Sequence, residues 1–390
     1  MQELARSLME CTEDVLVFQE AWTAEIRKIL VDGGRRAGFT HHWNPADGAG
    51  GGLLIISRLP FDQPRFERFH LTGTLGRLNR GEYLGGKGFA SVRLKTEQGP
   101  VWLVNTHLHA TYRSNQKFMS SAVRTAQLLQ LADSLPVSGE PVIVAGDFNC
   151  NQGDAEYVIW QGVSGMRDAA LAFDHPPSTI SSKNFYKRGI ESDDRRIDYV
   201  FVGNGSALAP EPIASRRVFD KTFDLRGRPR PISDHFGISL TFELQPTTSV
   251  QPVEVRRAAG PNIISNARRL LEKAKAEIDR EEITNDRVVA NLAMLAGGTV
   301  LLRSNERVTR RGLLHRALGF AGLAAIGPAV ALKAIALSDA DRQRHAFTAA
   351  TQTLAKFDHD GGRWARRELD SIIGSPAVPL TPKNGRSSNG

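Results

Sequence analysis

One stretch constrains the fold of this chain more than any other, residues 142–149 with the sequence Val-Ile-Val-Ala-Gly-Asp-Phe-Asn. Its apolar start is rich in β-branched residues, which indicates a buried strand, and Gly146 marks the end of that strand. Asp147 and Asn149 lie two positions apart, so in extended backbone both side chains point to one face. A carboxylate beside an amide suits a site that handles a hard metal ion, a water and a phosphate. A strand followed by an Asx-type turn gives the same pattern.

Two further strand ends carry polar candidates. Residues 14–18 predict a short strand, and Glu20 just beyond it is a candidate metal ligand or an ordinary acid at a helix start. Residues 101–105 predict a strand from which Asn105, His107 and His109 leave on one side. No further His or Cys ligand stands nearby. We therefore predict that His107 forms hydrogen bonds or stabilises charge, rather than binding zinc.

A glycine loop and two acidic motifs complete the candidates. Lys87 lies in the run Gly-Gly-Lys-Gly, which lacks Walker A spacing but can cradle a phosphate, or can be a plain hairpin turn. Asp198 lies on a predicted strand, residues 196–202. Asp234 and His235 precede the last predicted strand, where one carboxylate can bind metal while the imidazole faces a substrate. A simple turn cap is the alternative for that pair.

Helices and strands alternate irregularly along residues 1–245, with hairpins. This order favours a mixed two-sheet α/β sandwich over a parallel barrel. The same residues hold 28 basic and 28 acidic side chains, so the net charge of +8 lies entirely in the remaining tail. The neutrality of residues 1–245 argues against a nucleic-acid enzyme. Two cysteines, Cys11 and Cys150, argue against a disulfide framework.

The tail divides into three parts by composition. Residues 246–265 predict a linker, residues 266–370 a helical, membrane-associated region, and residues 371–390 a disordered end. Apolar runs at 288–302 and 317–337 flank an arginine-rich stretch. A transmembrane hairpin, interfacial helices on anionic lipid and a soluble helical bundle all fit this pattern, and the arginines favour a membrane. No N-terminal signal segment is evident.

Five short motifs follow one another along residues 1–245. They are Gln19-Glu20, Asn105-Thr106-His107, Gly146-Asp147-Phe148-Asn149, Arg196-Ile197-Asp198-Tyr199 and Ser233-Asp234-His235. In this order they resemble the endonuclease/exonuclease/phosphatase superfamily. Gly85-Gly86-Lys87, the run His107–Tyr112 and the apolar tail resemble, within it, the membrane-tailed neutral sphingomyelinases. The resemblance implies a four-layer α/β/β/α sandwich, as in DNase I, and a Mg²⁺-dependent phosphodiesterase that cleaves the headgroup phosphodiester of a sphingophospholipid.

The resemblance also implies a role for each candidate. His235 would be the general base, oriented by Asp198, and His107 would stabilise charge on the phosphorus. Glu20 and Asp234 would hold or approach the metal ion. Asp147 would orient the attacking water, and the substrate would be contacted by Lys87, Asn105 and Asn149.

One feature of the family pattern is missing from residues 1–245. The family's catalytic domain opens with a strand that ends in an asparagine, and this sequence begins at the helix that follows it. A start codon assigned too late, a fragment of a longer protein and an impaired protein are the alternatives. Because losing an interior strand would expose backbone on its neighbours, we expect reduced stability and weak activity of residues 1–390 as they stand. The alternatives to a lipid phosphodiesterase are a nuclease of the same superfamily and a membrane-anchored protein with a decayed site.

Overall fold

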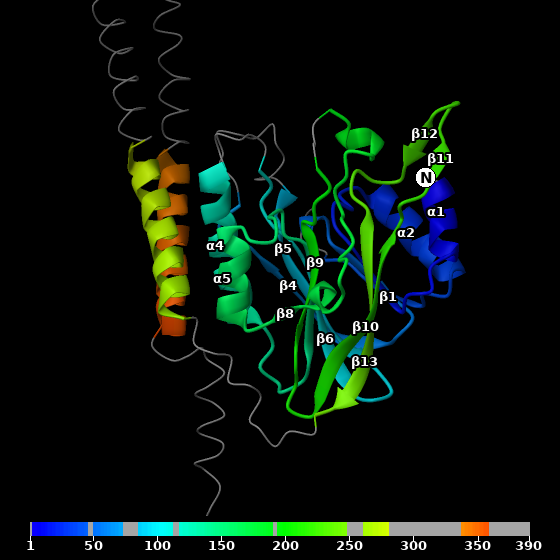
Figure 1. Cartoon of the computed structure of the whole chain (residues 1–390), viewed down its shortest axis with the longest axis horizontal. Coiled ribbons are helices and arrows are strands. Elements are labelled where there is room, and N and C mark those ends of the chain that lie inside the picture. The colour runs from blue at the N-terminus through cyan, green and yellow to red at the C-terminus, as the bar shows by residue number, and fades with distance from the viewer. Residues whose placement is uncertain are drawn as a thin grey trace, which may run out of the picture.

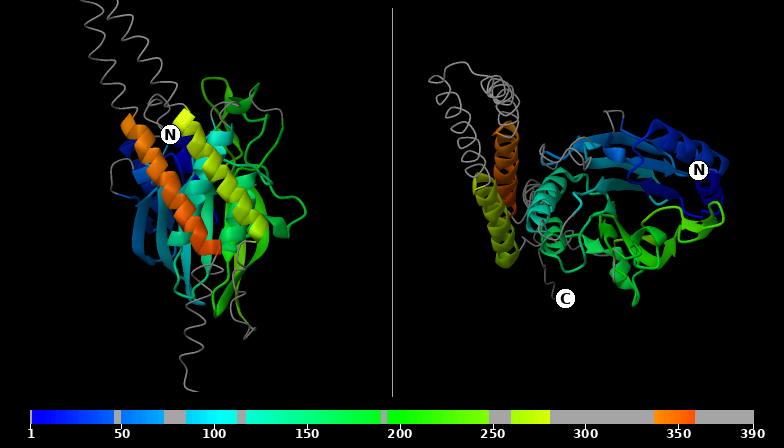
Figure 2. Two further views of the ribbon diagram at one scale, coloured as in Figure 1. Left: turned by 90° about the vertical axis from the view of Figure 1, so that its left-hand side faces the viewer. Right: turned by 90° about the horizontal axis from the view of Figure 1, so that it is seen from above.

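A computed structural model describes residues 2–45, 50–72, 85–111, 117–189, 193–247, 260–280 and 337–358. Two β layers face each other, and helices cover the outer face of each (Figures 1 and 2). Three clusters of buried apolar side chains fill the three spaces between these four layers. The predicted four-layer α/β/β/α sandwich is therefore confirmed.

The larger sheet has six strands in the order β4-β5-β6-β7-β9-β8. Neighbouring strands are antiparallel except β6 and β7, which are parallel. Parallel strands end at the same edge of a sheet, and an antiparallel neighbour begins there. The strands are β4 (Phe61–Arg68), β5 (Gly88–Lys95), β6 (Pro100–His107), β7 (Val142–Asp147), β8 (Arg167–Asp168) and β9 (Asp198–Gly203).

The second β layer contains two separate pairings, β1-β3-β2 and β10-β13. Within the described residues, β1 pairs only with β3, and β13 pairs only with β10. A small hairpin, β11-β12, precedes β13. The strands are β1 (Val15–Phe18), β2 (His41–Trp43), β3 (Leu54–Ser57), β10 (Leu208–Val218), β11 (Thr222–Asp224), β12 (Pro229–Pro231) and β13 (Gly237–Pro246).

Helices α1 (Gln2–Met9) and α2 (Ala24–Arg36) cover the sheet that holds β1 and β3, and α4 (Lys117–Ser134) and α5 (Ala155–Ser164) cover the six-stranded sheet. Thr23 caps α2 by accepting a hydrogen bond from the backbone N–H of Ile26. Short 3₁₀ helices lie in the loops, at Gly50–Gly52 (η1), Ala169–Ala172 (η4) and Phe185–Lys187 (η5).

Two C-terminal helices, residues 261–280 and 337–358, lie side by side against the layer formed by α4 and α5 (Figures 1 and 2). Their apolar side chains, including Leu271 and Leu354, belong to the same buried cluster as the inner faces of α4 and α5. Lys356 also forms an ion pair with Asp133 of α4, at 2.8 Å. The described parts of this region are thus packed on protein.

This packing corrects the prediction of a membrane-associated C-terminal region. In the described ranges no helix has both the length and the apolar character that crossing a bilayer requires. The apolar side chains of the two described helices are instead buried against α4 and α5. The two apolar runs at 288–302 and 317–337 lie outside the described residues, except for Leu337.

Gly146 is required where β7 approaches β6. Its φ is 150°, and a Cβ at this position would lie 2.0 Å from the carbonyl oxygen of Thr106. We expect Gly146→Ala to lower the free energy of unfolding by about 3 kcal/mol or more, measured by urea denaturation. Gly260→Ala is the control, because a Cβ there meets nothing within 4 Å. Equal stability of the two variants would contradict the close approach.

Candidate active site

Three of the predicted site residues lie side by side at one edge of the six-stranded sheet. His107 ends β6, Asp147 ends β7, and the two are paired across the parallel ladder. Asp198 begins β9 and lies opposite Asp147 in the antiparallel ladder. The strand register alone therefore brings a histidine and two carboxylates together, although the sequence separates the first and last by about 90 positions.

A tight turn holds Asp147 and Asn149 to each other. Asn149 has a φ of 52°, in the left-handed region that asparagine tolerates better than most residues. Its backbone N–H donates to Asp147 Oδ1 at 2.8 Å, and its side-chain Nδ2 donates to Oδ2 at 3.0 Å. Burial raises the pKa of the Asp147 carboxyl to about 7, and the nearby charge of Asp198 adds to this rise.

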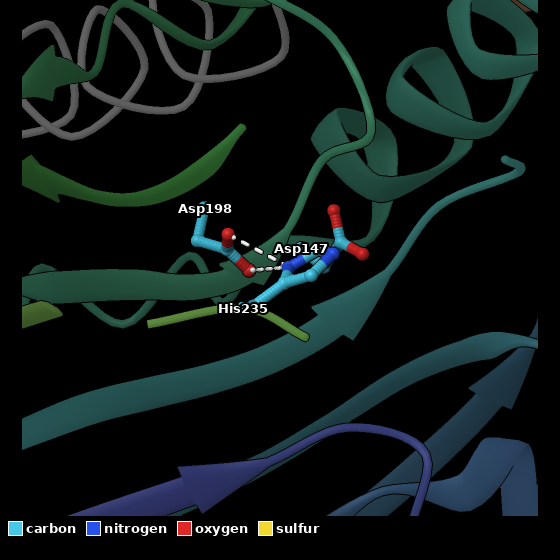
Figure 3. Close-up of side chains that lie close together, drawn as sticks. All are labelled: Asp147, Asp198 and His235. Carbon is cyan, nitrogen blue, oxygen red and sulfur yellow. Dashed lines mark hydrogen bonds and ion pairs between the residues drawn. The ribbon is translucent and has the colours of Figure 1, made fainter. Parts of the chain in front are cut away.

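His235 is held by Asp198. The ring nitrogen Nδ1 lies 3.1 Å from Asp198 Oδ2, and Figure 3 shows the ring between the carboxylates of Asp198 and Asp147. Burial by itself lowers the pKa of the ring, but Asp198, with further help from Asp147 and Asp234, raises that pKa to about 9. The contact also orients the ring, so that its other nitrogen remains for a second partner.

The carbonyl oxygen of Leu108 joins two other predicted residues to this edge. It accepts hydrogen bonds from Lys87 Nζ at 2.8 Å and from Asn149 Nδ2 at 3.1 Å. Lys87 is only 3% exposed, and its charge acts to lower the pKa of Asp147. His107 Nε2 lies 3.5 Å from Asp147 Oδ2. The structure thus gathers a cation, an amide and two imidazoles around the Asp147 carboxylate.

The remaining predicted residues lie at or beyond the margin of this group. Glu20 has a φ of 60° and an exposed side chain, with Oε1 4.0 Å from His107 Nε2. Asp234 is half-exposed and forms an ion pair with Lys187 at 2.9 Å. Asn105 is fully buried, where its Nδ2 donates to the carbonyl oxygens of Phe18 and Leu54, and so ties the two β layers together.

The donor set fits a divalent cation. Ligand atoms of Asp147, Asp198 and His235 all lie within 4.8 Å of one another, and two of the three are carboxylates, the ligands that hard cations prefer. Burial raises the pKa of Asp147, and the neighbouring Asp198 carboxylate raises it further; a bound cation would balance the negative charge of these two carboxylates. Glu20 and Asp234, the predicted metal ligands, are not part of this cluster.

Sequence reasoning missed the loop that supports His235. In the loop at residues 176–189, which was not among the sequence candidates, Asn184 Nδ2 donates to the carbonyl oxygen of Ser233 at 2.9 Å, and Lys187 pairs with Asp234. The only signal in the sequence is the polar and aromatic run from Asn184 to Lys187, which has no helical or strand period.

The chain matches a known protein family and several curated proteins. The model of the Endonuclease/Exonuclease/phosphatase family matches residues 1–235. An inositol phosphosphingolipids phospholipase C of Schizosaccharomyces pombe is 27% identical over 288 aligned residues, which cover 63% of this chain and 64% of that protein. A sphingomyelinase C of Leptospira interrogans is 26% identical over 251 residues, which cover 58% of this chain and 44% of that protein.

The chain thus spans less than two-thirds of the length of these curated relatives. A crystal structure of beta toxin from Staphylococcus aureus is 18% identical with a TM-score of 0.49, and covers 62% of this chain and 92% of that one. A structural likeness of this size does not bear on function. The predicted resemblance to the superfamily is confirmed by the family match. The two relatives carry the names of enzymes that act on sphingolipids, in line with the narrower resemblance.

Proposed function

Because the chain belongs to the endonuclease/exonuclease/phosphatase family, we propose that it hydrolyses the headgroup phosphodiester of a sphingophospholipid, in the manner of a phospholipase C. The observation that carries this proposal is the meeting of His107, Asp147 and Asp198 on three adjacent strand ends, with His235 held between the two carboxylates. The sphingolipid substrate is supported by the relatives' names. Residues 1–245 would form the catalytic unit.

The site would use a divalent cation, which we propose to be Mg²⁺ held by carboxylates of this cluster and by Glu20. When bound, the cation would neutralise charge on the phosphate oxygens. The positive charge of the bound cation would lower the pKa of His235 from its metal-free value, so that the neutral ring would remove a proton from the attacking water, and Asp198 would keep the ring oriented. Asp147 would orient that water, and Asn149 and Lys87 would face the phosphate. His107 would stabilise the charge that develops on it.

A substrate comparison tests the proposal. The purified chain would be given sphingomyelin and an inositol phosphosphingolipid in detergent micelles, and abasic and plasmid DNA, each with Mg²⁺ or with a chelator. We expect release of the phosphorylated headgroup only with the cation, and intact DNA. Cleavage of DNA without lipid turnover would favour the nuclease alternative, and no turnover of any substrate would overturn the proposal.

The titration of His235 provides a further prediction. Its pKa of about 9 lies above the ordinary value for histidine, so the folded state binds this proton more tightly than the unfolded state. In the metal-free protein, the stability that the His235–Asp198 contact contributes should be complete below about pH 6.5 and should be lost as pH rises through about 9.

Nuclear magnetic resonance of the imidazole C–H groups measures this directly. In Asp198→Asn the partner charge is removed, so we expect the pKa of His235 to fall by more than about one unit. Asp220→Asn, an exposed carboxylate paired with Arg217, is the control and should leave the titration unchanged. The same pKa in the wild type and in Asp198→Asn would show that Asp198 does not hold the ring.

A further inference from the structure

The segment that follows β6 is bound on two sides by fixed groups. On the sheet side, the Leu108 N–H donates to the carbonyl oxygen of Asp147 at 2.9 Å, and the Leu108 carbonyl accepts from Lys87 and Asn149. On the helix side, Gln127 of α4 accepts from the His109 N–H at 2.9 Å. Residues 107–109 therefore connect the inner face of α4 to the site, since His107 is the first of them.

Arg124 makes the other contacts from α4 to this segment. Its Nη1 donates to the carbonyl oxygen of His109 at 3.0 Å and to Thr111 Oγ1 at 2.8 Å. Arg124 and Gln127 are three positions apart and so lie on one helix face, where they bind both backbone polar groups of His109. The two side chains hold that peptide as a pair.

The Arg124 guanidinium is itself fixed by Glu156 of α5. Nε and Nη2 both donate to Glu156 Oε1, the first at 2.9 Å, and Ser121 donates to the other carboxylate oxygen. Both charged side chains are 2% exposed. Removing two charges from water costs about as much as their attraction returns, so a buried pair is weak evidence of a stabilising role. The contacts of Arg124 with His109 and Thr111 indicate a different role, which is to hold this segment in place.

We propose that Arg124 is a positioning residue for the active site. With Glu156 fixing the guanidinium, Arg124 sets the position of residues 107–111, and through the Leu108 carbonyl it sets Lys87 and Asn149 relative to Asp147. Arg124 does not touch the reacting atoms. The expected effect of Arg124 on the reaction rate rests on the proposed phosphodiesterase function. Its effect on the position of residues 107–111 rests on the geometry alone.

The double variant Arg124→Met with Glu156→Leu separates positioning from stability. Exchanging both charges for apolar side chains of similar size leaves no unpaired buried charge, so the fold should be retained. Small misplacements of catalytic groups cost up to about a hundredfold in rate. We therefore expect kcat to fall about 30- to 100-fold, with KM changed less than about twofold. The variant Arg124→Lys keeps the positive charge but loses the forked guanidinium, so its kcat should lie between those of the wild type and the double variant.

The matched control exchanges a partly buried pair at the other end of the same sheet. Arg93 lies on β5 beside Trp102, and its Nε is 3.0 Å from Glu140 Oε2, far along the strands from His107. Arg93→Met with Glu140→Leu should leave kcat unchanged. A folded Arg124→Met/Glu156→Leu protein with wild-type kcat would overturn the proposal.

Amide hydrogen exchange provides a readout that needs no activity. We expect the amides of Leu108 and His109 to exchange at least tenfold faster in the double variant, while the amides in the interior of α4 and α5 keep their protection. Unchanged exchange at Leu108 and His109 would also overturn the proposal. A wild-type chain that hydrolyses none of the test lipids would refute the proposed function instead, and the exchange result would still decide whether Arg124 positions this segment.

Discussion

Replacing His235 with alanine is expected to lower kcat for headgroup hydrolysis about a thousandfold, while the protein stays folded. A positioned general base contributes about 10²–10⁴ in rate, and His235 is placed for this role by its contact with Asp198. The His235 side chain is 23% exposed, and its contact with Asp198 lies at the edge of the sheet. Removing the imidazole therefore leaves no cavity deep in the core. Steady-state kinetics with sphingomyelin measures the loss, and circular dichroism checks the fold.

Two controls separate a base from a structural group. His70→Ala changes an exposed histidine whose backbone N–H, not its ring, bonds to Gln130, so activity should be kept. Imidazole added to His235→Ala should restore part of the rate, because the vacated position is partly exposed to solvent. Wild-type kcat in His235→Ala would remove the residue from the mechanism.

Asp147→Ala is expected to lower kcat about a thousandfold and to abolish the stabilisation of the fold by Mg²⁺. The carboxylate accepts both hydrogen bonds from Asn149 and faces His107, so its removal disconnects Asn149 and His107 from each other. In the wild type, Mg²⁺ at a hundredfold excess over its Kd should stabilise the fold by about 2.7 kcal/mol. The variant should show no such rise in Tm.

The metal-free stability of Asp147→Ala should remain close to that of the wild type. A buried carboxyl with a pKa of about 7 disfavours the folded state above its ordinary pKa, because the charged form is poorly solvated. Loss of this cost offsets loss of the Asn149 contacts. Asp174→Asn, an exposed carboxylate, is the control and should keep the Mg²⁺ effect. A Mg²⁺-dependent rise in Tm in Asp147→Ala equal to that of the wild type would exclude Asp147 from the cation site.

Local pattern was enough to predict the strand ends of the site. The β-branched run before Gly146 and the alternation of Asn105 with His107 are strand signals that need no partner, and β7 and β6 lie where they predict. The adjacency of His107, Asp147 and Asp198 follows from strand register. Register depends on pairings between distant segments, so local pattern could not predict it. That these residues meet was implied only by the resemblance to a known family.

Other parts of the structure leave no mark in the local sequence. Strand β10 contains Pro210 and Pro212, which disfavour a strand, but pairing with β13 around a bulge accommodates them. Asn105 alternates with His107 yet is turned into the core, because the second β layer covers its face of the sheet. The prediction of a membrane-associated tail rested on the apolar runs at 288–302 and 317–337 and the arginines between them. The helices that the structure describes, residues 261–280 and 337–358, are apolar on one face, and that face packs on α4 and α5.

The destination of the attacking oxygen tests the central claim most directly. The purified chain would be given sphingomyelin in water enriched in oxygen-18, the heavy isotope, and the masses of both products would be measured by mass spectrometry. If water that is activated by His235 attacks the phosphorus, the phosphorylated headgroup should contain one heavy oxygen and the ceramide none. A heavy oxygen in the ceramide, or no labelled product at all, would contradict the account.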